Sequence, residues 1–132
     1  MKMRNTLFLL GTALLGIVAA SVLGQSATFA ASDISRGEQL YVECAACHSF
    51  DNDTEELGPG LQGIFGRQAG GLEDYYYSPV LSNSGVVWNA DTLNAFIADP
   101  QAAIPLNRMP YSGLPDAQDR TDLIEYLRSA SE

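Results

Sequence analysis

The stretch Cys44-Ala45-Ala46-Cys47-His48 contains both cysteines and the one histidine of this 132-residue chain. Two cysteines separated by two residues and followed directly by histidine are the pattern of covalent c-type haem attachment. At this spacing near the end of a helix, both thiols reach one face, where each can form a thioether with a haem vinyl group. The imidazole of His48 then lies under the iron. The stretch therefore predicts one covalently attached haem c, with His48 as an axial ligand of its iron.

Three other interpretations of Cys44 and Cys47 compete with haem attachment. A structural zinc site needs four ligands and is mostly rich in cysteine, whereas this chain offers two cysteines and one histidine. A thioredoxin-like redox pair needs a βαβ context, and no segment shows the alternation of a strand. A plain disulfide would close a loop too small to stabilise the fold much. Haem attachment is favoured over all three.

The second axial position of the iron has few candidates. A second histidine does not exist in the chain, so ligation by two histidines is excluded. A tyrosine, a lysine, a methionine or no protein group at all remain. Met109 is the one methionine beyond Met3, and it lies in a polar loop before Pro110, where a methionine has little reason to serve as packing. We therefore expect Met109 as the second ligand, a combination with histidine that raises the reduction potential.

The first thirty residues resemble a targeting segment. Lys2 and Arg4 give a positive start, an uncharged apolar run follows, and small residues lead to Ala30. This pattern predicts a secretory signal peptide over residues 1–30, cleaved after Ala30, and a single monohaem domain over residues 31–132. An uncleaved membrane anchor is the competing interpretation, although the run is short for a bilayer span. Because no cysteine precedes Cys44, a lipid anchor on a processed N-terminal cysteine is excluded.

The chain is strongly acidic, with seven Lys and Arg against sixteen Asp and Glu and a formal charge of −9. Beyond residue 30 it has five arginines and no lysine, which leaves −11. Such a chain lacks the positive surface that phosphate backbones require, so a nucleic-acid partner is excluded. A small exported domain buries a thin core and often needs a covalent or cofactor staple, which agrees with the haem interpretation.

Several short helical patterns and no strand pattern predict an all-α fold. Long loops rich in glycine and proline join the helices, which suggests that a bound group fills the centre of the domain. The expected helix starts are a capping box at Ser35 and Glu38, the pair Ser78-Pro79, a cap at Asn89 for residues 90–98, and Asp116 for a last helix to about Ala130.

Taken together, these motifs resemble a class I c-type cytochrome of the bacterial soluble type. Gly37 and Tyr41 stand before the first cysteine, where that family packs its first helix on its last, and Leu123 and Tyr126 match the partner positions. Residues 58–67 resemble the loop that follows the haem motif, and residues 109–113 resemble the loop that carries the axial sulfur. The resemblance implies the small cytochrome c fold, with helices and long loops around one haem.

The resemblance also implies roles for further residues. The carbonyl of Pro59 would accept a hydrogen bond from the second imidazole nitrogen of His48 and fix the ring, and Leu61 would pack on the haem. Phe96 stands where many members have a tyrosine near the methionine sulfur, which should alter the potential and the ease of Met109 dissociation. The remaining residues expected around the haem, several near its propionates, are Arg67, Tyr77, Ser78, Trp88 and Leu93.

As to function, the resemblance implies a periplasmic one-electron carrier that is not an enzyme. Its partners would be redox proteins, and the acidic charge favours partners with a basic docking face. The alternative explanation of the acidic charge is solubility or a salty habitat. The lysine ring that mitochondrial members use for docking is absent. Contact with a membrane is expected only if residues 1–30 remain attached.

Two alternative functions stay open at this point. The chain could be the dedicated cytochrome subunit of a periplasmic dehydrogenase, which the sequence barely distinguishes from a free carrier. It could also be a haem gas sensor or a peroxidase-like protein with a labile Met109, although no distal histidine is available for peroxide chemistry.

Overall fold

A computed structural model describes residues 31–53 and 57–132, and the predicted signal peptide lies outside these residues. The helices are α1 (Ile34–Ala45), α2 (Pro79–Ser82), α3 (Ala90–Ala98), α4 (Pro100–Ala103) and α5 (Ala117–Ala130). In this part of the chain the only strand-like pairing is an isolated bridge between Gln68 and Val87. The all-α expectation is thus confirmed.

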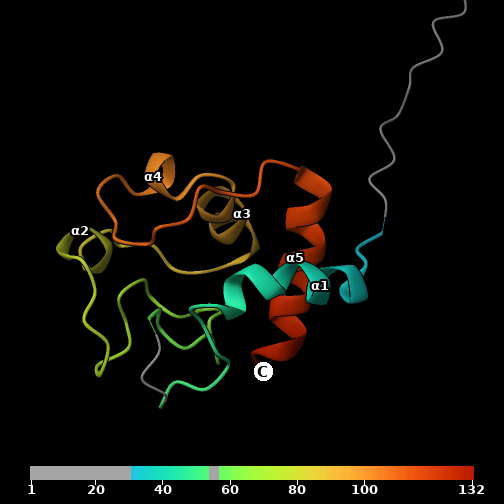
Figure 1. Ribbon diagram of the computed structural model, residues 1–132. Helices are drawn as coiled ribbons and strands as arrows, with labels where there is room; N and C mark the ends of the chain where they lie inside the picture. Colours follow the sequence, from blue (N-terminus) through green and yellow to red (C-terminus); the bar gives the residue numbers. More distant parts are fainter. Residues whose placement is uncertain (1–30, 54–56) are drawn as a thin grey trace, which may run out of the picture.

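The two longest helices, α1 and α5, cross on one side of the molecule, and long loops with the short helix α2 make up the other (Figure 1). Figure 1 shows α5 crossing α1 on the right, with α3 beside them, whereas α2 and the loops of residues 57–78 lie on the left. Helix α1 packs mainly on α5, and α3 contacts both α5 and α4. None of the helices in the described ranges is long and apolar enough to cross a membrane.

Local capping explains where α3 and α5 begin. The Asn89 side chain accepts a hydrogen bond from the Thr92 amide at 2.9 Å, and the Thr92 hydroxyl accepts one from the Asn89 amide at 2.8 Å. This reciprocal pair satisfies two amides that a helix start leaves without partners. Asp116 caps α5 through the Asp119 amide in the same way. The starts expected at Asn89, Asp116 and Ser78-Pro79 are confirmed.

The capping box expected at Ser35 is wrong. The cap of α1 is Asp33, whose carboxylate accepts hydrogen bonds from the Arg36 amide and the Ser35 hydroxyl, and Ser35 lies inside the first turn. The physical reason is tertiary, because the Asp33 amide donates to the buried Asp122 carboxylate on α5 at 2.9 Å. A contact across 89 positions thus fixes the register of the helix start.

The crossing of α1 and α5 depends on Gly37. A Cβ atom at this position would lie 2.7 Å from Tyr126 Cβ and closer still to the Asp122 carbonyl oxygen. Next to the crossing, Tyr41 stacks on Phe50 at 4.8 Å between ring centroids and meets Tyr126 at 5.4 Å. The helix-on-helix packing that the resemblance implied for Gly37 and Tyr41 is therefore present.

Candidate haem site

The two cysteines lie at the C-terminal end of α1. Cys44 is in the last turn, and the amides of Cys47 and His48 both donate to its carbonyl oxygen, at 3.0 and 2.9 Å. Both thiols are free and half-buried. Burial, with a smaller contribution from the charge of Glu43, raises the pKa of the Cys44 thiol to about 11.

The imidazole of His48 is held from the loop that follows the motif. Its Nδ1 lies 2.7 Å from the carbonyl oxygen of Pro59. Because a carbonyl can only accept, Nδ1 carries a proton and donates it, which is the tautomer that presents Nε2 to a metal. The contact that the resemblance implied for Pro59 is thus present, and it fixes the orientation of the ring.

Two further groups hold the backbone around His48. The Tyr41 hydroxyl donates to the His48 carbonyl at 3.1 Å, and burial raises the pKa of this tyrosine to about 12, which keeps the donor protonated. Gly58 lies so close to the imidazole that an added Cβ would be 2.7 Å from Nδ1. Its amide donates to the Cys47 carbonyl at 2.7 Å. The loop therefore approaches the ring through a residue without a side chain.

Replacing Gly58 by alanine should turn the His48 ring away from Pro59. The added methyl group meets the ring, and we expect a loss of about 1–3 kcal/mol in the free energy of unfolding, together with a changed haem absorption spectrum. Denaturant unfolding and the spectrum check this. The control is Gly85→Ala, where an added methyl meets no atom within 4 Å, so only backbone strain remains. An unaltered spectrum in Gly58→Ala would contradict the expected role of this loop.

Met109 lies in a loop whose backbone is fixed from the side of α4. Asn107 is buried, and its Nδ2 donates to the carbonyls of Pro100 at 2.7 Å and Ile104 at 2.8 Å. Its Oδ1 accepts from the Met109 amide at 2.9 Å. Both ends of one buried amide thus connect the methionine backbone to the helix before it, and the Met109 side chain is half-buried.

The same loop contains a strained residue. Leu106 has a φ of +66°, the one described residue other than glycine with a positive φ, and its side chain is 79 % exposed. A left-handed leucine costs about 1–2 kcal/mol. Gln101 spans this point, because its amide accepts from the Leu106 N–H at 3.2 Å and donates to the Asn107 carbonyl at 3.0 Å. The loop is thus kept in shape by side-chain contacts.

The apolar residues expected around the haem lie in the core. Trp88, Leu93 and Phe96 are buried, and the rings of Trp88 and Phe96 are 5.0 Å apart. Leu61 is half-buried and packs against the same cluster. The structure therefore brings together the apolar residues that the sequence assigned to the site.

The polar residues expected near the propionates differ in whether their side chains have partners within the chain. Arg67 donates to the carbonyls of Gly60 at 2.7 Å and Gln62 at 3.0 Å, and burial lowers its pKa. It therefore braces the loop that starts at Gly58. Tyr77 is half-buried, which raises the pKa of its hydroxyl. Ser78 is buried, and within the described chain its Oγ has no hydrogen-bond partner. A buried hydroxyl of this kind needs an explanation, and an anionic group of the cofactor is one.

The donor set fits a haem better than a bare metal ion. In residues 31–53 and 57–132, no group of three or more His, Cys, Asp or Glu side chains is placed to hold a metal. One imidazole nitrogen, one thioether and two free thiols suit a cofactor that brings its own equatorial ligands. The orphaned Ser78 hydroxyl suits the same group.

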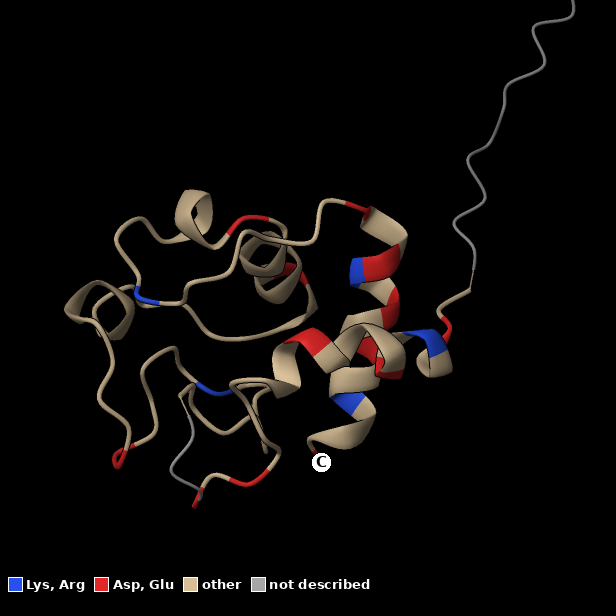
Figure 2. Cartoon of the chain, viewed as in Figure 1, with Lys and Arg blue, Asp and Glu red and all other residues tan. Residues whose placement is uncertain are grey.

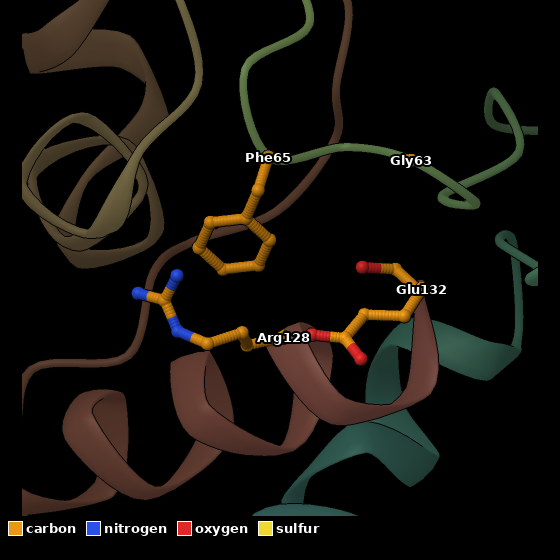
Figure 3. A pocket seen from close by; sticks show the side chains of 5 residues that line it. Gly63, Phe65, Arg128 and Glu132 are labelled. Atoms are coloured by element: carbon orange, nitrogen blue, oxygen red, sulfur yellow. The ribbon is translucent and has the colours of Figure 1, made fainter.

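A small pocket of about 200 Å³ lies elsewhere, at the end of α5 (Figure 3). Its lining is Gly63, Phe65, Arg128, Ser131 and Glu132. Within it the guanidinium of Arg128 lies over the Phe65 ring, 4.3 Å from the centroid. None of the residues expected to bind the haem lines this pocket.

The fold and the donor set define a c-type haem protein. The sequence model of the cytochrome c family matches residues 34–131, and the chain belongs to this family. Members carry one covalently attached haem c, and the chain is an electron-carrier c-type cytochrome whose partners are redox proteins.

Curated relatives support the same assignment. The chain is 39% identical to cytochrome c2 of Blastochloris viridis over 85% of its own length and 86% of the relative's. It is 38% identical to cytochrome c of Gibberella zeae, over 78% of this chain and 99% of the relative. Cytochrome c2 of Rhodomicrobium vannielii is 32% identical, over 86% of this chain and 91% of the relative.

Some contacts around the site could not be read from the sequence. The amides of Asn107 and Gln101 and the charge of Arg108 were not predicted to act at the site, although Asn107 and Arg108 directly precede Met109. A polar amide two residues before a candidate ligand is a usable signal, since a short side chain there can reach the following backbone amide. The long-range partners of Gln101 and Arg108 have no such signal.

Proposed function

We propose that this protein is a periplasmic one-electron carrier whose haem is attached through Cys44 and Cys47, with His48 and Met109 as the axial ligands of the iron. The observation that carries the proposal is the His48–Pro59 contact of 2.7 Å directly after the attachment motif. It orients the ring and directs Nε2, the other ring nitrogen, to the iron. The haem, when bound, supplies the iron that takes up and releases one electron.

The protein's part is to hold the two ligands and to keep water away. His48 is oriented by Pro59 and by the close approach of Gly58. Met109 is placed by Asn107, and its thioether favours ferrous iron and a raised potential. The apolar surface around the haem would be formed by Leu61, Trp88, Leu93 and Phe96. The polar residues near its propionates would be Arg67, Tyr77 and Ser78. With both ligands retained in both oxidation states, the site changes little during electron transfer.

The N-terminal segment supports export to the periplasm. A positive start, an apolar run and small residues before Ala30 are what a secretory signal requires. Mass spectrometry of the exported protein tests the segment and the haem together. We expect the mass of residues 31–132 plus one haem. Retention of residues 1–30, or a mass without haem, would contradict the proposal.

The distribution of charge supports a partner with a basic docking face. Acidic residues are spread over α1, α5 and the loops (Figure 2). The arginines beyond residue 30 are engaged within the chain: Arg36 with Asp119, Arg67 with loop carbonyls, Arg108 with the Tyr77 carbonyl, Arg120 with the Leu114 and Pro115 carbonyls, and Arg128 with Phe65. The surface therefore offers few cations to an acidic partner.

Electron exchange with a basic redox protein should consequently slow as salt is added. Long-range attraction speeds encounter and is screened by ions, so we expect a fall of about tenfold between low and physiological ionic strength. Stopped-flow mixing measures this rate. A small uncharged reductant is the control, and its rate should stay constant. A rate with the basic protein that rises with salt would contradict the docking proposal.

A further inference from the structure

Arg108 connects the loop of Met109 to a distant segment. Its Nη2 donates to the carbonyl of Tyr77 at 2.8 Å, and its guanidinium lies 4.9 Å from the centroid of the Tyr76 ring. Tyr76 is 82 % exposed, so the ring adds little to the core. Arg108 thus makes two contacts, one polar and one to an aromatic face, from the position directly before the candidate ligand.

The segment that Arg108 reaches is itself anchored. Ser78 is buried behind it, and the rings of Tyr75 and Tyr77 meet at 4.7 Å. The Tyr75 hydroxyl donates to the carbonyl of Leu57 at 2.8 Å. Leu57 directly precedes the Gly58–Pro59 pair that holds His48. A continuous series of contacts therefore runs from the loop of Met109 to the loop of His48.

The loop of Met109 depends on such contacts. Leu106 is strained, and the buried Asn107 fixes the loop only on the side of α4. The loop also packs on the core through Met109 and Tyr111, and at its end the Leu114 amide donates to the Ile97 carbonyl of α3 at 2.8 Å. Two side chains of the loop make polar contacts with distant segments: Arg108 and, more loosely, Tyr111, whose hydroxyl lies 3.4 Å from Glu43 Oε2. Of these two contacts, the charged guanidinium with two partners is the stronger.

We propose that Arg108 is a positioning residue that latches the Met109 loop onto residues 75–77 and so keeps the thioether in place. The proposal rests on the proposed ligation by Met109. Without the latch the loop should open more often, because an exposed cation–π contact and one charged hydrogen bond are lost. From the size of such contacts we expect about tenfold more frequent opening.

Binding of carbon monoxide to the reduced, haem-loaded protein measures this opening. At saturating gas, the rate of binding is limited by departure of the methionine sulfur. We expect Arg108→Ala to bind about tenfold faster than the unaltered protein, Tyr76→Leu to lie between the two, and Arg108→Lys to restore part of the difference. Each variant should retain a full content of covalent haem.

Arg128→Ala is the matched control, since Arg128 also lies over an aromatic ring but at the end of α5 (Figure 3). Its binding rate should equal that of the unaltered protein. If Arg108→Ala and Arg128→Ala have the same rate, or if the rates follow only the thermal stabilities of the variants, the latch is refuted. Immediate binding by the unaltered protein would instead refute the ligation by Met109, so the two failures are distinguishable.

Discussion

Replacing Met109 by leucine should convert a protein that, when reduced, binds carbon monoxide only as slowly as the methionine sulfur departs into one that binds it at once. Leucine keeps nearly the volume of methionine, so the half-buried loop should stay packed. The sulfur is lost, and within the described chain the only imidazole, that of His48, already bonds to Pro59. Beyond residue 30 the sequence contains no other methionine or histidine that could take its place opposite His48.

The reduction potential should fall in the same variant. A thioether favours ferrous iron, so its removal stabilises the ferric state relative to the ferrous state. Absorption spectra under carbon monoxide and a redox titration measure both effects. Leu114→Ala is the control, because Leu114 packs in the same region without a sulfur atom. A Met109→Leu protein whose carbon monoxide binding and haem reduction potential both equal those of the unaltered protein would show that Met109 is not a ligand.

Replacing Gly37 by alanine should destabilise the fold by about 3–5 kcal/mol. Replacing a glycine by alanine in a helix ordinarily raises the free energy of unfolding by about 1 kcal/mol. The sign of the measured change therefore distinguishes close packing at Gly37 from an ordinary helical position. Here the added Cβ would lie 2.7 Å from Tyr126 Cβ and against the Asp122 carbonyl. The two helices would have to move apart, which would also disturb the contact between Tyr41 and Tyr126.

Denaturant unfolding of the haem-loaded protein measures this effect. Gln39→Ala is the control, because Gln39 is an exposed residue of the same helix and its replacement should change the free energy of unfolding by less than about 0.5 kcal/mol. A Gly37→Ala protein as stable as the unaltered one would contradict the close packing of α1 on α5.

Local signals in the sequence account for most helix starts. Asn89 and Thr92 form a capping pair whose geometry depends only on neighbours, and the expected helix over residues 90–98 is confirmed. The start of α1 could not be found in this way. Ser35 and Asp33 are both suitable caps, and the choice between them depends on Asp122, which lies on another helix. Local chemistry offers the candidates, and tertiary contacts select one.

The candidate site follows the same division. The motif at Cys44 and His48 is read directly from the sequence, because covalent attachment requires that spacing. The role of Asn107 depends on which carbonyls meet its amide, and Arg67 donates to carbonyls of its own loop. These partners become visible only when the chain is folded. The sequence therefore predicts the candidate ligands, and the structure shows which contacts hold those residues.

The most direct test of the account is the exposure of the purified, reduced, haem-loaded protein to carbon monoxide at neutral pH. We predict no rapid change in the haem absorption, only a slow one at the rate at which the Met109 sulfur departs, because the proposed ligands His48 and Met109 would occupy both axial positions of the iron. Rapid and complete binding would contradict it, since the iron would then be open and the protein would be suited to sensing or catalysis at the haem.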